Sequence, residues 1–145
     1  MLMILMNYFP VKIIKILSEH KKIFLWLALT WTAMVTFLCL VKFDNIPKVS
    51  VSNFDKLGHF TFHYGMTAFW FLYYKFQKTN SFKKSLVKGF AFSVVYGIII
   101  EFIQAFCTKT RNGDLFDVFA NMTGSIAAAL TAVLLMKVAR NLKSD

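Results

Sequence analysis

Four long apolar runs, separated by short polar or charged connections, dominate the pattern of the chain. They cover about residues 23–41, 57–76, 89–106 and 115–136. A helix of about 20 residues is about 30 Å long, which matches the hydrocarbon core of a bilayer. The pattern therefore predicts an all-α polytopic membrane protein, in which residues 23–145 form one bundle of four transmembrane helices.

The segment before the first run has a different pattern. Between Val11 and Lys22, charged residues recur at helical spacing among aliphatic ones. A helix with one charged and one apolar face lies in the plane of the membrane surface. We therefore expect residues 1–22 to form a short interfacial helix. A cleaved signal peptide is not expected, because no basic stretch precedes the apolar residues 1–6 and no small-residue cleavage site follows them.

The basic residues favour one orientation in the membrane. The N-terminal segment, the connection over residues 75–88 and the C-terminal tail carry most of the lysines and arginines, and the other two connections carry fewer. Loops rich in Lys and Arg remain in the cytoplasm. We therefore expect both termini in the cytoplasm and the connections near residues 42–56 and 107–114 on the outer side.

Composition and charge agree with this assignment. Of the 145 residues, 57% are hydrophobic, and a soluble domain of this size cannot bury four separate apolar runs in one core. The net charge is +10, but the lysines stand in blocks between the runs and not along one helix face. Nucleic-acid binding is therefore not expected. The two cysteines, Cys39 and Cys107, show no zinc-ligand spacing.

Polar residues interrupt the later three runs at a similar depth. His63 and Asn121 each lie about six residues, ~9 Å, below the outer start of their run, and Glu101 lies about five residues, ~8 Å, below the outer end of its run. A carboxylate in hydrocarbon costs several kcal/mol unless it is paired, hydrated or protonated. Glu101 is therefore expected either in a functional, water-accessible site or in a structural contact with Arg111 or a histidine.

Helical spacing places further polar residues on the same faces. Steps of three and four residues place these polar residues in three stripes, one on each of the later three helices, that can face each other. We interpret the three stripes as the lining of a polar cavity open to the outside. The candidate ligand-binding residues are Asp55, Lys56, His59, Glu101, Gln104, Arg111, Asp114, Asp117 and Asn121.

Two of these assignments have plain structural alternatives. Asp114 follows the turn sequence Asn112-Gly113, where an N-cap belongs, and Asp117 could satisfy the same helix end. His59 and His63 at i and i+4 could bind zinc together with Glu101. No further ligand motif accompanies the pair, so hydrogen-bonded histidines are favoured, and no metal or other cofactor is predicted.

The ordered polar motifs resemble the VanZ-like family. They are Asp55-Lys56-x-x-His59, then Glu101-x-x-Gln104, then Arg111-x-Gly113-Asp114-x-x-Asp117-x-x-x-Asn121-x-x-Gly124, and they span about residues 55–128. The resemblance implies a small multi-helix protein of the bacterial cytoplasmic membrane, and the family's namesake is associated with low-level resistance to teicoplanin, a glycopeptide. It implies no particular reaction, and His63 is not part of the pattern.

Three functions fit these residues. We expect the cavity to bind or modulate a cell-envelope lipid, a lipid-linked envelope precursor or a glycopeptide, with Lys56 and Arg111 pairing anionic groups. The alternative is a membrane-embedded hydrolase or transferase that acts on a lipid-linked precursor, with Glu101 or His59 as the catalytic general acid or base, so enzymatic activity stays open. Proton-coupled transport through a homo-oligomer of such bundles is the third.

Overall fold

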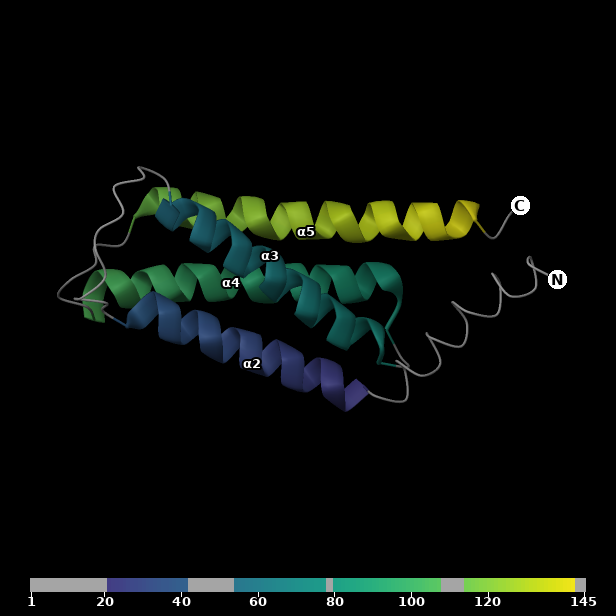
Figure 1. Ribbon diagram of the computed structural model, residues 1–145, viewed down its shortest axis with the longest axis horizontal. Helices are drawn as coiled ribbons and strands as arrows, with labels where there is room; N and C mark the ends of the chain where they lie inside the picture. The colour runs from purple at the N-terminus through teal and green to yellow at the C-terminus, as the bar shows by residue number, and fades with distance from the viewer. Residues whose placement is uncertain (1–20, 42–53, 78–79, 108–113, 143–145) are drawn as a thin grey trace.

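The computed structural model describes residues 21–41, 54–77, 80–107 and 114–142. These residues form four α-helices, α2 (Lys21–Leu40), α3 (Phe54–Lys75), α4 (Phe82–Cys107) and α5 (Leu115–Asn141), and the described residues contain no strand. Successive helices run in opposite directions along the bundle (Figure 1). The all-α prediction is confirmed over these ranges. The expected interfacial helix lies outside the described residues, apart from Lys21 and Lys22, which begin α2.

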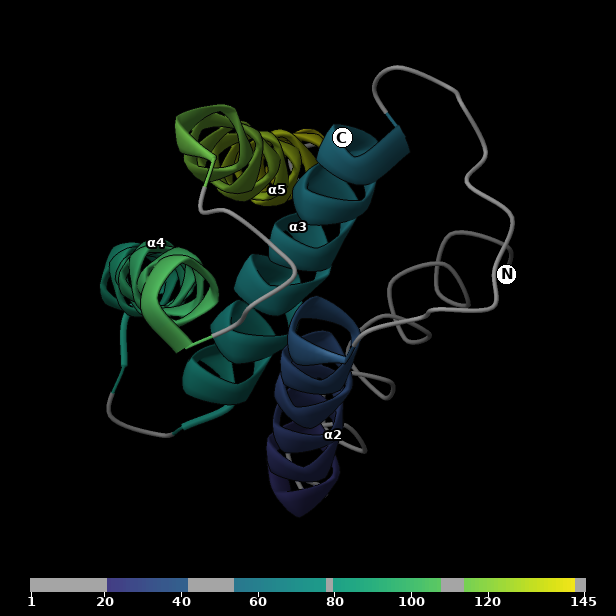
Figure 2. The same cartoon turned by 90° about the vertical axis from the view of Figure 1, so that its left-hand side faces the viewer.

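Helix α3 is central and packs against each of the other three helices (Figure 2). The indole of Trp31 on α2 donates to the Phe62 carbonyl at 2.9 Å, and the hydroxyl of Tyr64 contacts that of Thr131 on α5 at 3.2 Å. The ring centroids of Trp70 and Phe92, on α3 and α4, are 4.2 Å apart. Most of the surface of α3 therefore faces protein.

Three helices are long and apolar enough to cross a membrane: α2, α4 over Phe82–Phe106, and α5. Helix α3 is not among them, although the second apolar run predicted a span there. The reason lies in its first half, which carries Asp55, Lys56, His59 and His63. The four-span prediction is therefore supported for three of its helices by length and composition.

The apolar core lies between α2, α3 and α4. It consists of small and medium side chains of α2 packed against larger ones of its neighbours, namely Ala28, Val35, Cys39, Met66, Trp70 and Ile100. Many large apolar side chains instead point outward, such as Trp26, Phe102 and Phe119, which are more than 60% exposed. A bundle whose outer surface is this apolar suits a lipid environment.

One glycine permits a close crossing of α3 and α5. A Cβ placed on Gly124 would collide with the backbone carbonyl of Phe60. Small residues at helix interfaces allow such close approach in membrane bundles. The crossing brings the first half of α3, including His59, next to Asn121, which lies three residues before Gly124.

Helices α4 and α5 extend beyond the apolar runs that predicted them. Helix α4 begins at Phe82, where Ser81 accepts a hydrogen bond from the backbone N–H of Lys84 at 3.3 Å. Lysine is a good helix former and places its charge in water while its stem covers apolar surface. The basic residues after Ser81 therefore extend the helix beyond the predicted start at residue 89.

Candidate functional site

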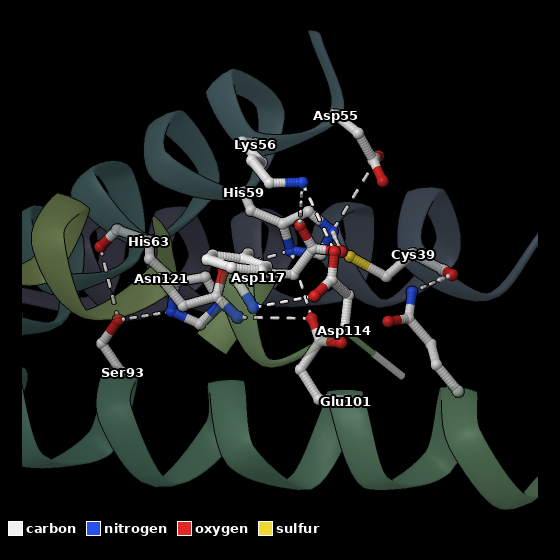
Figure 3. Close-up of polar contacts among 12 residues, drawn as sticks. Cys39, Asp55, Lys56, His59, His63, Ser93, Glu101, Asp114, Asp117 and Asn121 are labelled. Carbon is white, nitrogen blue, oxygen red and sulfur yellow. Dashed lines mark hydrogen bonds and ion pairs between the residues drawn. The ribbon is translucent and has the colours of Figure 1, made fainter. Parts of the chain in front are cut away.

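The predicted site residues gather at the end of the bundle where α3 begins, α4 ends and α5 begins (Figure 3). We call this group the polar cluster, and its members are Asp55, Lys56, His59, Glu101, Gln104, Asp114, Asp117 and Asn121. Arg111, the remaining predicted site residue, lies outside the described residues. The polar cluster therefore contains eight of the nine predicted positions.

The polar cluster has a buried interior and an exposed rim. His59, Gln104 and Asn121 are 2% exposed, and Glu101 and Asp117 are 5% exposed. Asp55 lies on the exposed rim, and the side chains of Lys56 and Asp114 are 36% and 41% exposed. Where the sequence predicts an open polar cavity, these residues therefore pack against one another beneath a charged rim.

His59 is the centre of the cluster. Its Nδ1 atom lies 3.1 Å from the side-chain oxygen of Asn121 and 3.4 Å from Oε1 of Glu101. Its Nε2 atom lies 3.8 Å from Oδ2 of Asp117 and 4.0 Å from Oδ1 of Asp55. One imidazole ring therefore joins residues from α3, α4 and α5.

The neighbours of His59 determine which ring nitrogen holds the proton. A carboxylate oxygen only accepts hydrogen bonds, so the amide nitrogen of Asn121 faces Oε1 of Glu101, 3.5 Å away. The amide oxygen of Asn121 then faces His59 and requires a donor there. Nδ1 of His59 therefore carries the proton, and in the neutral ring Nε2 presents a lone pair toward the two aspartates.

Lys56 connects the rim to the interior. Its ammonium group donates to Oδ2 of Asp114 at 3.4 Å and lies 3.9 Å from Oδ1 of Asp117. It also lies 5.7 Å from the ring centroid of Phe116. The ammonium group of Lys56 thus lies close to two carboxylates of the protein itself. The sequence had predicted that Lys56 pairs with an anionic ligand.

Asp114 is the N-cap of α5. Its carboxylate accepts a hydrogen bond from the backbone N–H of Phe116 at 2.8 Å, and its backbone is extended, as N-cap residues require. That hydrogen bond, followed by the nearby ammonium group of Lys56, lowers the pKa of the Asp114 carboxyl below its ordinary value. Asp114 therefore acts as a helix cap, which was the structural alternative for this residue. The buried carboxylate of Asp117 lies instead near Lys56 and His59.

Gln104 connects α4 to α2. Its amide nitrogen donates to the backbone carbonyl of Cys39 at 2.8 Å. That carbonyl belongs to the last turn of α2, where backbone acceptors have no partner within the helix. Gln104 therefore stabilises the end of α2, a role that differs from the predicted ligand binding.

A second polar layer lies one turn deeper. The sequence placed His63 at the level of Glu101 and Asn121, but the structure places His59 there, because α3 begins at Phe54 and not near residue 57. Nδ1 of His63 lies 2.9 Å from the hydroxyl of Ser93. The hydroxyl of Ser93 lies 2.9 Å from that of Ser125, a residue that the sequence analysis missed although it stands four positions after Asn121.

Several buried polar atoms have no hydrogen-bond partner within the described part of the chain. They are Nε2 of His63, Oγ1 of Thr67, Oε2 of Glu101 and Oδ1 of Asp117. An unsatisfied buried polar group costs about 1–3 kcal/mol, and more when it is charged. Glu101 and Asp117 therefore each keep one oxygen that can accept a hydrogen bond from a group outside the described residues.

The structure groups metal-ligand atoms differently from the set considered in the sequence. His63 is bonded to Ser93, and the combination of His59, His63 and Glu101 does not converge. The ligand atoms that do converge belong to Asp55, His59 and Asp117, and they lie within 4.8 Å of one another. A metal ion would therefore contact the rim side of His59.

Comparisons with known proteins complete the description. A search of curated proteins finds no match, and a search of solved structures finds none. A family model described as VanZ/LLP1 matches residues 1–136, which include all the motif residues of the polar cluster. Since the match covers most of the chain, the protein belongs to the VanZ/LLP1 family, as the resemblance predicted.

Proposed function

We propose that the chain is a multi-pass protein of the bacterial cytoplasmic membrane that crosses the bilayer four times, with α3 as the fourth span. Because α3 is enclosed by α2, α4 and α5, its polar residues face protein and not lipid. Cytoplasmic termini are supported by the basic residues at the end of the bundle opposite the polar cluster, which are Lys21, Lys22, Lys75, Lys83, Lys84, Lys88, Lys137 and Arg140.

In this topology the polar cluster lies just below the outer surface, and we propose that it binds the polar head of a cell-envelope molecule. The observation that carries the proposal is the pair of carboxylates of Glu101 and Asp117. Each is 5% exposed and retains an oxygen without a hydrogen-bond partner in the described residues. Carboxylates held in this state act in proteins mainly as binding or catalytic groups.

The balance of donors and acceptors in the cluster indicates the chemistry of the ligand. Four carboxyl groups surround one ammonium group and one imidazole, so acceptors outnumber donors. The complementary ligand supplies hydroxyl, amide N–H or ammonium groups. A glycopeptide, or the sugar and peptide of a lipid-linked envelope precursor, carries such donors.

A membrane-embedded hydrolase or transferase is the second candidate function. The specific observation in its favour is the position of His59, whose two ring nitrogens face the carboxylates of Glu101 and Asp117 at 3.4 and 3.8 Å. A histidine oriented by carboxylates can accept and return a proton. Release of a cleaved head group from a lipid-linked precursor by the purified protein would favour this candidate over binding alone.

Isosteric substitutions test the binding proposal. Glu101→Gln and Asp117→Asn keep the size of each side chain and remove its charge, and Thr123→Val is the control, because Thr123 is exposed on α5 and bonds within its own helix. Vesicles containing each variant at equal membrane levels are titrated with fluorescent teicoplanin and with a lipid-linked disaccharide-peptide. We expect at least about 10-fold weaker binding of one of these probes to both carboxylate variants, which corresponds to about 1.4 kcal/mol.

The control and the susceptibility of cells complete this test. Thr123→Val should bind as the unaltered chain does, and cells that produce the carboxylate variants should lose any change in teicoplanin susceptibility that the unaltered chain confers. If neither probe binds the unaltered chain, or if all three variants bind equally, the polar cluster does not hold an envelope head group.

A further inference from the structure

We infer that Asp55, His59 and Asp117 form a binding site for a divalent transition metal, with zinc as the expected ion. The inference does not depend on the proposed function, because it follows from the arrangement of ligand atoms on α3 and α5. The three side chains converge at the rim of the polar cluster, where α3 and α5 both begin (Figure 3).

Three potential ligand atoms face one another at the rim without a hydrogen bond between them. Nδ1 of His59 faces the side-chain oxygen of Asn121, so Nε2 is the nitrogen left for a metal, and it lies 3.8 Å from Oδ2 of Asp117 and 4.0 Å from Oδ1 of Asp55. Both distances exceed those of hydrogen bonds. A cation placed among two carboxylates and a ring nitrogen is attracted to all three.

The spacing of these three ligand atoms is close to that around a zinc ion. Zinc binds nitrogen and oxygen at about 2.1 Å, so neighbouring ligands of a tetrahedral ion lie about 3.4 Å apart. The two separations from Nε2 of His59, 3.8 and 4.0 Å, are a few tenths of an ångström larger, and all three ligand atoms lie within 4.8 Å of one another. The side chain of Asp55, which is 63% exposed, can rotate to shorten its own distance to Nε2 of His59.

The groups that contact the other side of the His59 ring also favour metal binding. A metal-bound histidine commonly donates its other ring N–H to a carboxylate or an amide oxygen, which fixes the ring and raises its basicity. Asn121 and Glu101 supply this arrangement at Nδ1 of His59. Lys56 lies near Oδ1 of Asp117, and thus leaves Oδ2 for the metal.

The charge balance permits a cation beside Lys56. The ammonium group is close to Asp114 and Asp117, whereas Asp55 and Glu101 have no such partner among the described residues. The imidazole ligand favours zinc or a similar transition metal over calcium or magnesium, which prefer oxygen. Three protein ligands leave a fourth position open for water or a ligand oxygen.

Zinc binding by the full-length chain tests the inference directly. Protein purified in detergent is stripped with a chelator and titrated with zinc alone, with bound metal measured by mass spectrometry and affinity by competition with a chromophoric chelator. We expect one zinc per chain, and at least about 10-fold weaker binding in Asp55→Asn. Because Asp55 is exposed, this variant retains the buried contacts of the bundle.

Two matched controls make the result specific. Asp114→Asn removes a nearby carboxylate outside the ligand set and keeps the N-cap, and His63→Gln removes a buried histidine one turn deeper. His63→Gln should keep one zinc per chain at unchanged affinity, Asp114→Asn should keep one zinc per chain and bind it more tightly than Asp55→Asn does, and His59→Gln should lose the zinc.

The inference is overturned if the unaltered chain binds no zinc, or if Asp55→Asn and Asp114→Asn weaken binding equally. These readouts contain no envelope ligand. Zinc binding therefore supports the metal site even if neither teicoplanin nor the lipid-linked precursor binds. If zinc does not bind, the metal site is wrong, and the proposed binding of an envelope molecule is still tested by its own experiment.

Discussion

The side-chain oxygen of Asn121 lies 3.1 Å from Nδ1 of His59, and both residues are 2% exposed. The contact joins α5 to α3, and the nitrogen of the same amide faces Glu101 on α4 at 3.5 Å. Asn121 thus orients a histidine and a carboxylate that belong to two different helices. A side chain that has oxygen at one position and nitrogen at the other is required for both contacts.

Replacing Asn121 with leucine should destabilise the bundle. The change removes the acceptor of the His59 N–H and the donor to Glu101, and leaves buried polar groups unsatisfied, at a cost of about 1–3 kcal/mol. The measurement is unfolding of the purified chain in mixed micelles with increasing denaturing detergent. Thr123→Val, an exposed position on the same helix, should stay within about 0.5 kcal/mol of the unaltered chain. Equal stability of the two variants would contradict the role given to Asn121.

Two glycine-to-alanine changes should have opposite effects. In Gly124→Ala the new methyl group meets the carbonyl of Phe60, so α5 must move away from α3, at a cost of about 1–3 kcal/mol. In Gly58→Ala the nearest atom, on the ring of Phe62, is 3.8 Å from the new Cβ, and the helix gains about 0.5–1 kcal/mol. The same unfolding assay measures both. A stable Gly124→Ala variant would show that the helices do not approach closely at this position.

The charge of Asp114 should stabilise the protein at neutral pH and not in acid. The backbone N–H of Phe116, and then Lys56, lower the pKa of this carboxyl in the folded state. A group with a lowered folded pKa contributes stability above its unfolded pKa, and the contribution disappears as the pH falls through the folded value. Asp114→Asn keeps the cap, so its melting temperature should be below that of the unaltered chain at neutral pH, and the difference should vanish on acidification. A difference that does not change with pH would contradict this origin.

Gln104→Leu should weaken the bundle without changing zinc binding at the rim of the polar cluster. The substitution removes the donor to the Cys39 carbonyl in the last turn of α2, at a cost of about 1 kcal/mol. The folded variant should bind zinc with the affinity of the unaltered chain, because its amide points to α2 and not to His59. Unfolding in detergent and zinc titration separate the two effects. Loss of zinc binding by a folded Gln104→Leu would place Gln104 in the site after all.

Helical spacing was sufficient to predict which faces carry the polar residues. Steps of three and four residues placed Glu101 with Gln104 and Asp117 with Asn121, and the structure brings these faces together at one end of the bundle. The apolar runs likewise predicted the helices, with ends that differ by up to seven residues at α4. These features depend on the local spacing of polar and apolar residues, which can be read directly from the sequence.

The contacts between helices could not be predicted in the same way. Whether His59 or His63 meets Glu101 depends on where α3 begins and on how closely it crosses α5, and the second of these follows from Gly124 beside Phe60. The convergence of Asp55 and Asp117 on His59 depends on the same crossing. No spacing along the chain specifies a distance between two helices that meet side by side.

The enclosed position of α3 has a consequence for biosynthesis. A segment that carries Asp55, Lys56, His59 and His63 gains little from entering lipid by itself, since each polar group there would lose water without a replacement. Partners for His59 and His63 reside on α4 and α5, which the ribosome makes later. In the proposed four-span topology, we therefore expect entry of α3 into the bilayer to depend on the C-terminal half of the chain, so that the last helices synthesised complete the insertion of an earlier one.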